Sequence, residues 1–224
     1  MWTYWQREFA EHGRASYAID LRGHGASDPL DLSRTSIWDY VDDVANLSSQ
    51  FKGSPVVMGW SMRGHVAVLA AARGGFSACV AFDPDPPAAT VDDSVALDYG
   101  VQQPQEIGYA VEGDPALLGA SMPGLDLEEL RIAQSSLCGE SLMMASERKR
   151  GIVVETMPCP LLEVIGGYDD DYLDEPGYHD IGMADHQIMV SESSHWGLVL
   201  DRRVLAQLMP QVLEWLSVTA GPDS

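Results

Sequence analysis

The stretch from Val56 to His65 constrains the fold more than any other part of the chain. A run of apolar residues ends at Gly59, Ser61 follows two residues later, and an Ala- and Val-rich segment begins after Gly64. This pattern predicts a strand that enters a helix through a tight turn with a serine at its apex. Such a turn strains the backbone of its central residue, and it lifts the hydroxyl away from the sheet. The first N–H groups of the following helix can stabilise an anionic oxygen.

Strand and helix patterns alternate on both sides of this turn. Short connections between successive strands and helices indicate a parallel sheet with right-handed crossovers. We therefore predict an α/β fold, with a mostly parallel sheet flanked by helices. The expected helices are 2–12, 36–51, 66–72 and 202–216, and the expected strands are 16–20, 55–60, 77–82, 160–165 and 186–191.

Residues 88–156 interrupt this alternation. They are rich in Gly, Pro and acidic residues, and they contain only two weaker helical patches, at 126–137 and 141–150. We interpret them as an inserted helical lid within a single domain. The core of that domain is then formed by residues 1–87 and 157–224.

The charge of the chain excludes some classes of partner. Acidic residues outnumber basic ones 34 to 13, which gives a formal net charge of −21. A surface of this kind repels phosphate backbones, so we expect no nucleic-acid partner. We interpret the charge itself as a solubility or salt-tolerance trait.

Cysteine usage and hydropathy indicate where the protein works. No apolar stretch approaches the roughly 18 residues of a membrane span, and no signal peptide is evident, so we expect no membrane association. Three widely spaced cysteines suit a reducing compartment, and we predict a cytoplasmic protein without structural disulfides. The cysteines show no metal-ligand spacing, and the acidic run 169–174 lacks the pattern of a calcium loop. We therefore expect no metal.

Three polar side chains follow strands at the edge of the sheet where reactive groups gather. Ser61 follows one strand, Asp170 a later one, and His195 the last. A histidine can take the proton of a serine hydroxyl, and a carboxylate can orient the imidazole. The order Ser, Asp, His is the one expected on such a sheet. The other members of the run 169–171, and Asp83 at the end of another strand, are alternative carboxylates.

Structural roles compete with each of these interpretations. Ser61 could be a plain helix N-cap, and His195 could be a loop histidine packed on Trp196. His24, between two glycines, is better explained as part of a turn, and His65 as a packed helix residue.

Four motifs in a fixed order carry a family resemblance: Tyr17–Asp28 (YAIDLRGHGASD), Gly59–Met62 (GWSM), Gly166–Asp170 (GGYDD) and Ser194–Gly197 (SHWG). With them the chain resembles the α/β-hydrolase superfamily over nearly its whole length. The resemblance implies that the second motif is the nucleophile elbow, the third the acid loop and the fourth the histidine loop.

The resemblance also assigns roles to single residues. The family's Gly-x-x-Asp pattern favours Asp170 as the acid. Met62, which follows the nucleophile, would supply one oxyanion-hole N–H. Trp60 and Trp196 would line the substrate pocket, although a core role for Trp60 is an alternative.

Two features depart from the family pattern. Arg63 stands where a small residue is usual, so its side chain would either crowd the turn or project into the site as a cation. The family also has strands and a His-Gly oxyanion loop before the first helix, and one of those strands lies between the strands expected here at 16–20 and 55–60. We therefore expect either a truncated reading frame or a sheet in which those two strands pair directly.

The function implied is that of a cofactor-free serine hydrolase acting on a small-molecule ester, lactone or thioester. One alternative is a non-catalytic relative that binds a small molecule. Another is a triad enzyme of different chemistry, such as a carbon–carbon bond hydrolase or a cofactor-free perhydrolase. A homo-oligomer is compatible with the sequence.

Overall fold

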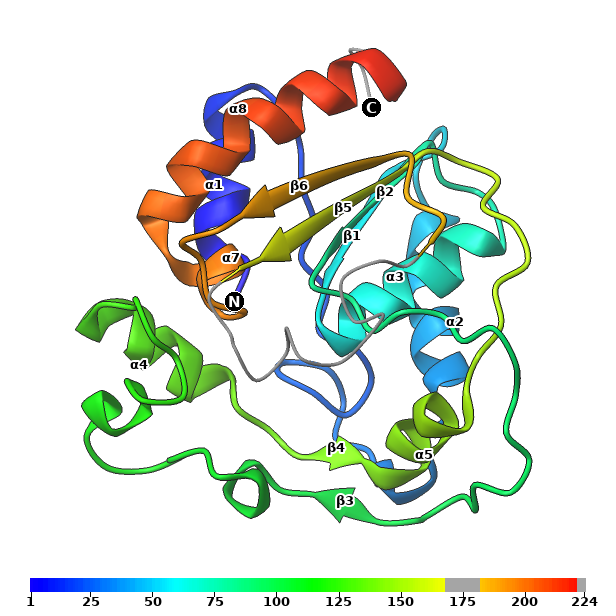
Figure 1. The fold of residues 1–224 in the computed structure, drawn as a ribbon, viewed down its shortest axis with the longest axis vertical. Helices are drawn as coiled ribbons and strands as arrows, with labels where there is room; N and C mark the ends of the chain where they lie inside the picture. The colour runs from blue at the N-terminus through cyan, green and yellow to red at the C-terminus, as the bar shows by residue number, and fades with distance from the viewer. Residues whose placement is uncertain (168–181, 221–224) are drawn as a thin grey trace.

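A four-stranded parallel sheet forms the centre of the computed structural model, which describes residues 1–167 and 182–220. Its strand order is β1-β2-β5-β6, and Val56 of β1 lies opposite Ala78 of β2 (Figure 1). The parallel sheet expected from the sequence is confirmed. The strands are β1 (Val56–Trp60), β2 (Ala78–Phe82), β5 (Leu161–Gly166) and β6 (His186–Val190).

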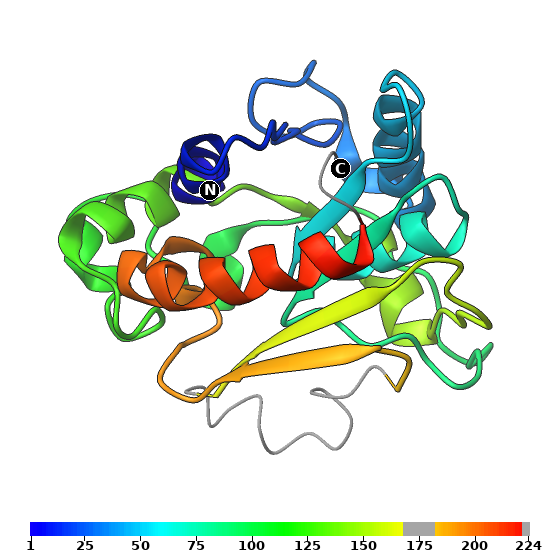
Figure 2. The same ribbon diagram turned by 90° about the horizontal axis from the view of Figure 1, so that it is seen from above.

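Helices cover both faces of this sheet, as Figures 1 and 2 show. One face packs against α2 (Ile37–Ser48) and α3 (Met62–Ala72), and the other against α1 (Thr3–Glu11), α7 (Gly197–Leu200) and α8 (Arg202–Thr219). The buried strands explain this arrangement, because successive side chains point to opposite faces. On β2, Val80 and Phe82 belong to the core under α1 and α8, whereas Cys79 and Ala81 belong to the core under α3.

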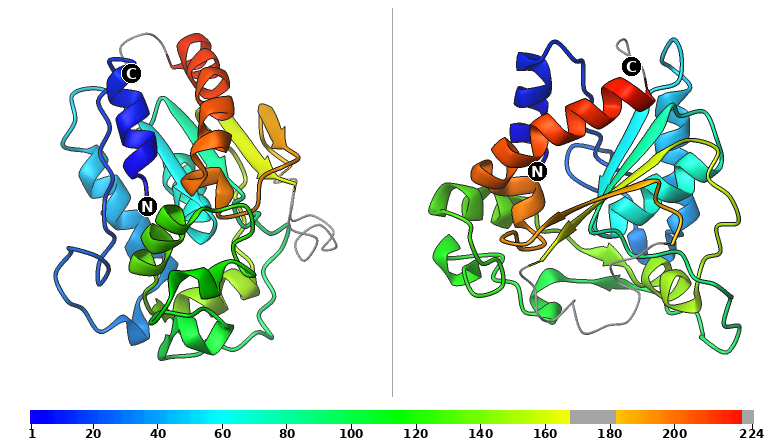
Figure 3. Two further views of the ribbon diagram at one scale, coloured as in Figure 1. Left: turned by 90° about the vertical axis from the view of Figure 1, so that its left-hand side faces the viewer. Right: turned by 45° about the horizontal axis from the view of Figure 1, so that its top comes forward.

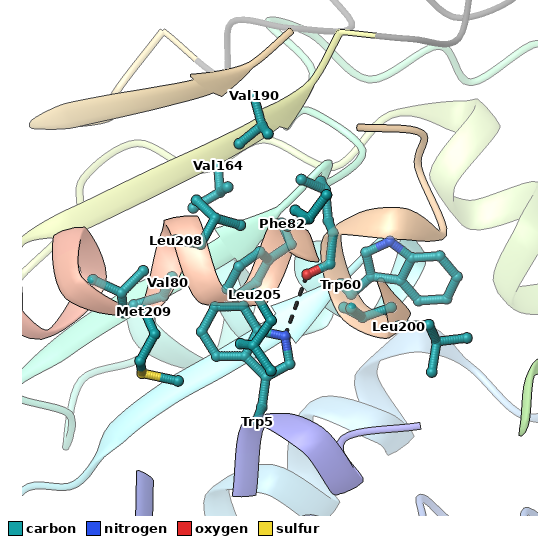
Figure 4. Close-up of a cluster of buried hydrophobic side chains, with 14 of the residues drawn as sticks. Trp5, Trp60, Val80, Phe82, Val164, Val190, Leu200, Leu205, Leu208 and Met209 are labelled. Atoms are coloured by element: carbon teal, nitrogen blue, oxygen red, sulfur yellow. Dashed lines mark hydrogen bonds between the residues drawn. The ribbon is translucent and has the colours of Figure 1, made fainter. Parts of the chain in front are cut away.

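Aromatic side chains anchor the core between α1, α8 and the sheet. The Trp5 ring lies 4.8 Å from the Phe82 ring in an edge-on contact, and its Nε1 donates a hydrogen bond to the Leu198 carbonyl at 3.2 Å (Figure 4). Trp5 is 1% exposed. Burial of such a ring stabilises the fold by about 2–3 kcal/mol, so α1 is fixed against the sheet and α7.

Local capping sets the start of α2. The Ser36 side chain and the N3 residue Asp39 form a reciprocal capping box, which satisfies two N–H groups at the helix start. The Glu147 carboxylate accepts a further hydrogen bond from the Ile37 N–H at 2.7 Å. Glu147 belongs to α5 (Leu142–Arg150), so this cap also ties the insertion to the core.

The strand expected at residues 16–20 does not form, and that prediction was wrong. Direct pairing of this segment with β1 does not occur either, because β1 is the edge of the four-stranded sheet. A cavity of ≈ 500 Å³ is lined by residues of both segments, among them Tyr17, Ile19, Val56 and Met58. An isolated segment without a hydrogen-bonded neighbour cannot satisfy its backbone as a strand, which explains the failure of the prediction.

The insertion between β2 and β5 contains both helices that its sequence predicted. They are α4 (Leu127–Ser136) and α5, and the insertion also contains a short antiparallel pair, β3 (Val101–Gln102) with β4 (Glu140–Ser141). Figures 1 and 3 show the insertion as a separate layer below the sheet. The remaining elements among the described residues are the 3-10 turns η1 (Leu32–Arg34), η2 (Pro104–Ile107) and η3 (Pro115–Leu118). None of the described helices combines the length and apolar character needed to cross a membrane.

Candidate active site

Ser61 occupies a strained turn between β1 and α3. Its φ of 58° and ψ of −134° lie outside the regions that L-residues usually adopt, and such a conformation costs about 1–3 kcal/mol. The surrounding backbone fixes it: the Ser61 N–H donates to the Phe82 carbonyl at 2.9 Å, and the Ser61 carbonyl accepts from Gly64 at 2.8 Å. Strain of this kind, imposed by the neighbouring structure, is typical of functional serines.

Two glycines make the turn possible. A Cβ at Gly59 would lie 2.2 Å from the backbone oxygen of Arg63, and a Cβ at Gly64 would lie 3.0 Å from the Pro84 Cβ. The requirement for small neighbours therefore falls on Gly59 and Gly64. Residue 63 approaches β1 through its backbone, and its side chain is not among the nearest atoms to either position.

Arg63 neither crowds the turn nor projects into the site as an unpaired cation. Its guanidinium forms an ion pair with Glu140 of β4. Glu140 in turn lies 3.2 Å from the His24 Nε2. The long side chain therefore connects the second residue of α3 to the insertion.

The N–H of Met62 lies in the first turn of α3, where a helix has no internal acceptor. It makes no hydrogen bond to any residue that the structure describes. This is the condition expected of an oxyanion donor beside Ser61.

His195 and Asp83 form a buried pair. The His195 Nδ1 lies 3.1 Å from the Asp83 Oδ2, and the two side chains are 8% and 5% exposed. The other carboxylate oxygen, Oδ1, accepts a hydrogen bond from the Gly166 N–H at 2.8 Å. Asp83 itself has a φ of 37°, so its turn at the end of β2 is strained as well. The pair holds the imidazole with its Nδ1 toward a carboxylate.

Trp60 joins His195 to the turn. The Trp60 Nε1 donates to the His195 carbonyl at 2.8 Å, and the two rings lie 4.6 Å apart. The Trp196 ring lies 4.7 Å from the Trp60 ring, and its Nε1 donates a hydrogen bond to the Tyr109 hydroxyl at 3.3 Å. The structure thus brings the histidine loop against the residue that precedes Ser61. Trp60 and Trp196 are both largely buried, at 6% and 7% exposed.

Asp170, the carboxylate favoured by the sequence, lies outside the described residues, and it stays a prediction. Asp83 was an alternative because it also ends a strand. The sequence signal for it is the abrupt stop Asp83-Pro84 after the buried run Ala78–Phe82. Sequence reasoning missed Glu140 as the partner of Arg63, because the two residues are 77 positions apart.

A match to a protein-family sequence model identifies the family of this chain. The model of the alpha/beta hydrolase family matches residues 1–210. The chain belongs to the alpha/beta hydrolase family. No curated protein matches this alpha/beta hydrolase significantly.

Solved structures share the fold of this alpha/beta hydrolase. Tomato methylketone synthase I with 2-tridecanone superposes with a TM-score of 0.72 at 14% identity, covering 97% of this chain and 93% of the other. Polyneuridine aldehyde esterase gives 0.70 at 16%, with 95% and 93% covered. A methylesterase from Arabidopsis gives 0.69 at 13%, with 96% and 93% covered. At these identities the likeness establishes the fold.

Proposed function

We propose that this alpha/beta hydrolase is a serine hydrolase that cleaves an ester, lactone or thioester bond of a small molecule. The observation that carries the proposal is the buried contact between His195 Nδ1 and Asp83, in a loop packed on Trp60 next to the strained Ser61. Esterases among the structures of the same fold support this reaction class.

The mechanism assigns one role to each group. Asp83 keeps the proton of His195 on Nδ1, so that Nε2 can accept the hydroxyl proton of Ser61. Ser61 Oγ attacks the carbonyl carbon, and the N–H of Met62 donates to the oxyanion that forms. His195 then protonates the leaving group, and water repeats the sequence to release the acid.

Asp83 takes the place of Asp170 in this proposal. Its carboxylate has one oxygen on His195 and the other on the Gly166 N–H, so it is oriented before substrate arrives. A preorganised carboxylate is the arrangement that catalysis requires. Asp170 remains a testable alternative.

The insertion, residues 88–156, is proposed to act as a lid that selects the substrate. One of its residues, Tyr109, accepts a hydrogen bond from Trp196, and another, Glu140, pairs with Arg63, two positions after Ser61. A small-molecule substrate is therefore expected to contact both the core and the insertion.

Labelling with a fluorophosphonate probe tests the proposal without knowledge of the substrate. The intact mass of the parent should rise by one adduct, and the mass of Ser61→Ala should not change. Ser49→Ala is the control, because Ser49 is an exposed serine at the end of α2 whose hydroxyl donates to the Asn46 carbonyl. This variant should label like the parent. A folded parent that takes no label would refute the mechanism.

A further inference from the structure

Three side chains of metal-binding type meet where the loop of His24 faces the insertion. They are His24, Cys138 and Glu140, and their ligand atoms all lie within 4.8 Å of one another. A set of imidazole, thiolate and carboxylate suits Zn²⁺ more than the harder cations, which prefer oxygen alone. We propose that His24 Nε2, Cys138 Sγ and the Glu140 carboxylate bind a zinc ion, with water as the fourth ligand.

The imidazole of His24 is prepared for this role. Its Nδ1 lies 2.9 Å from the Arg22 carbonyl, which can only accept a hydrogen bond. Nδ1 therefore carries hydrogen, and Nε2 faces Glu140 at 3.2 Å. Metal-binding histidines typically use their second nitrogen in this way.

Further contacts fix the orientation of the His24 imidazole and of the carbonyl that it contacts. Asp43 accepts hydrogen bonds from both the backbone N–H and the guanidinium of Arg22, which fixes the carbonyl that His24 contacts. The Tyr40 ring packs edge-on against the imidazole at 5.6 Å. His24 is 6% exposed, so its orientation is set by packing.

Unsatisfied polar atoms surround the same point. The Glu140 Oε2 and the Tyr40 hydroxyl are buried and have no hydrogen-bond partner among the described residues. An unpaired buried polar atom costs about 1–3 kcal/mol. A zinc ion with its bound water would supply a partner to both the carboxylate and the hydroxyl.

The exposed side chain of Cys138 makes the proposed site accessible to an ion from solvent. The cysteine is exposed, in the connection between α4 and β4, whereas His24 is buried. Ligand atoms around a tetrahedral zinc lie about 3.3–3.8 Å apart for bonds of about 2.0–2.3 Å. Rotation of the exposed Cys138 side chain can close the remaining distance without movement of the core.

Arg63 is the natural objection, because its cation already pairs with Glu140. Zinc enters as two positive charges, and the Cys138 thiol loses its proton when its sulfur binds the metal. The thiolate that forms therefore offsets one of the two charges added beside Arg63. Arg63 and His24 both contact Oε1 of Glu140, so the unpaired Oε2 is the oxygen left for the metal.

Sequence patterns do not indicate such a site, and this proposal departs from the expectation of no metal. His24 is distant along the chain from Cys138 and Glu140, and only the approach of the insertion to the His24 loop brings the three side chains together. The proposed site does not use Ser61, His195 or Asp83, so its test is independent of hydrolase activity.

The experiment measures binding of Zn²⁺ and Co²⁺ to the full chain after treatment with a chelator. Competition with a chromophoric chelator should give one Zn²⁺ per chain, and Co²⁺ should produce a thiolate-to-metal charge-transfer band. Cys138→Ser should lose the band and bind Zn²⁺ at least tenfold more weakly, and Glu140→Gln should weaken binding as well. Because Cys138 is exposed, this variant should melt at the temperature of the metal-free parent.

His12→Gln provides a matched control. His12 also has its Nδ1 on a backbone carbonyl, that of Glu8 at 2.9 Å, but it lies exposed at the end of α1. This variant should bind like the parent. The proposal is overturned if the parent shows no charge-transfer band, or if Cys138→Ser binds Zn²⁺ with unchanged affinity.

Discussion

Replacing Asp83 with asparagine should separate the role of this carboxylate from its contribution to folding. The side chain is 5% exposed, and its Oδ1 accepts the Gly166 N–H at 2.8 Å. An asparagine must keep its carbonyl oxygen toward that N–H, which turns its amide N–H₂ toward His195 Nδ1. The imidazole then has to accept at Nδ1, and its proton moves to Nε2.

The consequence for reactivity follows from this change of tautomer. An Nε2 that carries a proton cannot take the proton of Ser61, so the nucleophile is no longer activated. The corresponding change in a serine triad lowers the rate about 10⁴-fold, and this equals about 5 kcal/mol of barrier. Both hydrogen bonds of residue 83 survive in the variant, so its melting temperature should stay close to that of the parent.

The assay is the rate of fluorophosphonate labelling of Ser61, read by intact mass. Asp170→Asn is the paired variant, and it should label within tenfold of the parent rate. The reasoning is refuted if Asp83→Asn labels at the parent rate. Loss of labelling in Asp170→Asn with retention in Asp83→Asn would transfer the role to Asp170.

Three further predictions concern stability, each measured by thermal unfolding. Gly59→Ala should lower the free energy of unfolding by about 1–3 kcal/mol, because its Cβ would meet the Arg63 backbone oxygen at 2.2 Å; an unchanged melting temperature would contradict this. Trp5→Phe should cost about 1–3 kcal/mol, since a buried carbonyl loses its donor, and a cost near zero would argue against the hydrogen bond. Burial opposes the charge on His24, but its attraction to Glu140 raises the pKa of His24 above 6.5. Burial also opposes the charge on Glu140, but Arg63 together with His24 lowers the pKa of Glu140 below 4.5. The contribution of His24 to the free energy of unfolding should therefore be complete below about pH 6.5 and be lost as pH rises through the folded pKa of His24. The contribution of Glu140 should be lost as pH falls through the folded pKa of Glu140. With chelator present, a stability difference between the parent and His24→Gln that grows toward alkaline pH would contradict this.

Local sequence patterns were sufficient for most of the fold. The strand, turn and helix around Ser61 were predicted because a buried apolar run, two glycines and an Ala-rich helix leave few other conformations. The same holds for α2, whose capping residue Ser36 stands next to the first helical residue. These signals act over a few residues, so neighbours in the sequence contain them fully.

The segment at residues 16–20 shows where local patterns fail. Its sequence is compatible with a strand, but a strand requires a backbone partner, and none of the described strands pairs with it. Whether such a segment pairs is decided by the arrangement of distant chain segments.

The sequence by itself determined most of the helices and strands, and it placed Ser61 at the apex of the turn between a strand and a helix. Only the tertiary structure identified Asp83 as the carboxylate that contacts His195 among the described residues. Several acidic residues follow strands, and the sequence does not distinguish well between them. Only the tertiary structure joined Arg63 and His24 to Glu140, since charge pairs form between surfaces that the fold brings together. Short-range sterics and hydrophobic periodicity depend on residues that are neighbours in the sequence. The partner of a charged side chain depends on which distant residues the tertiary fold brings next to that side chain.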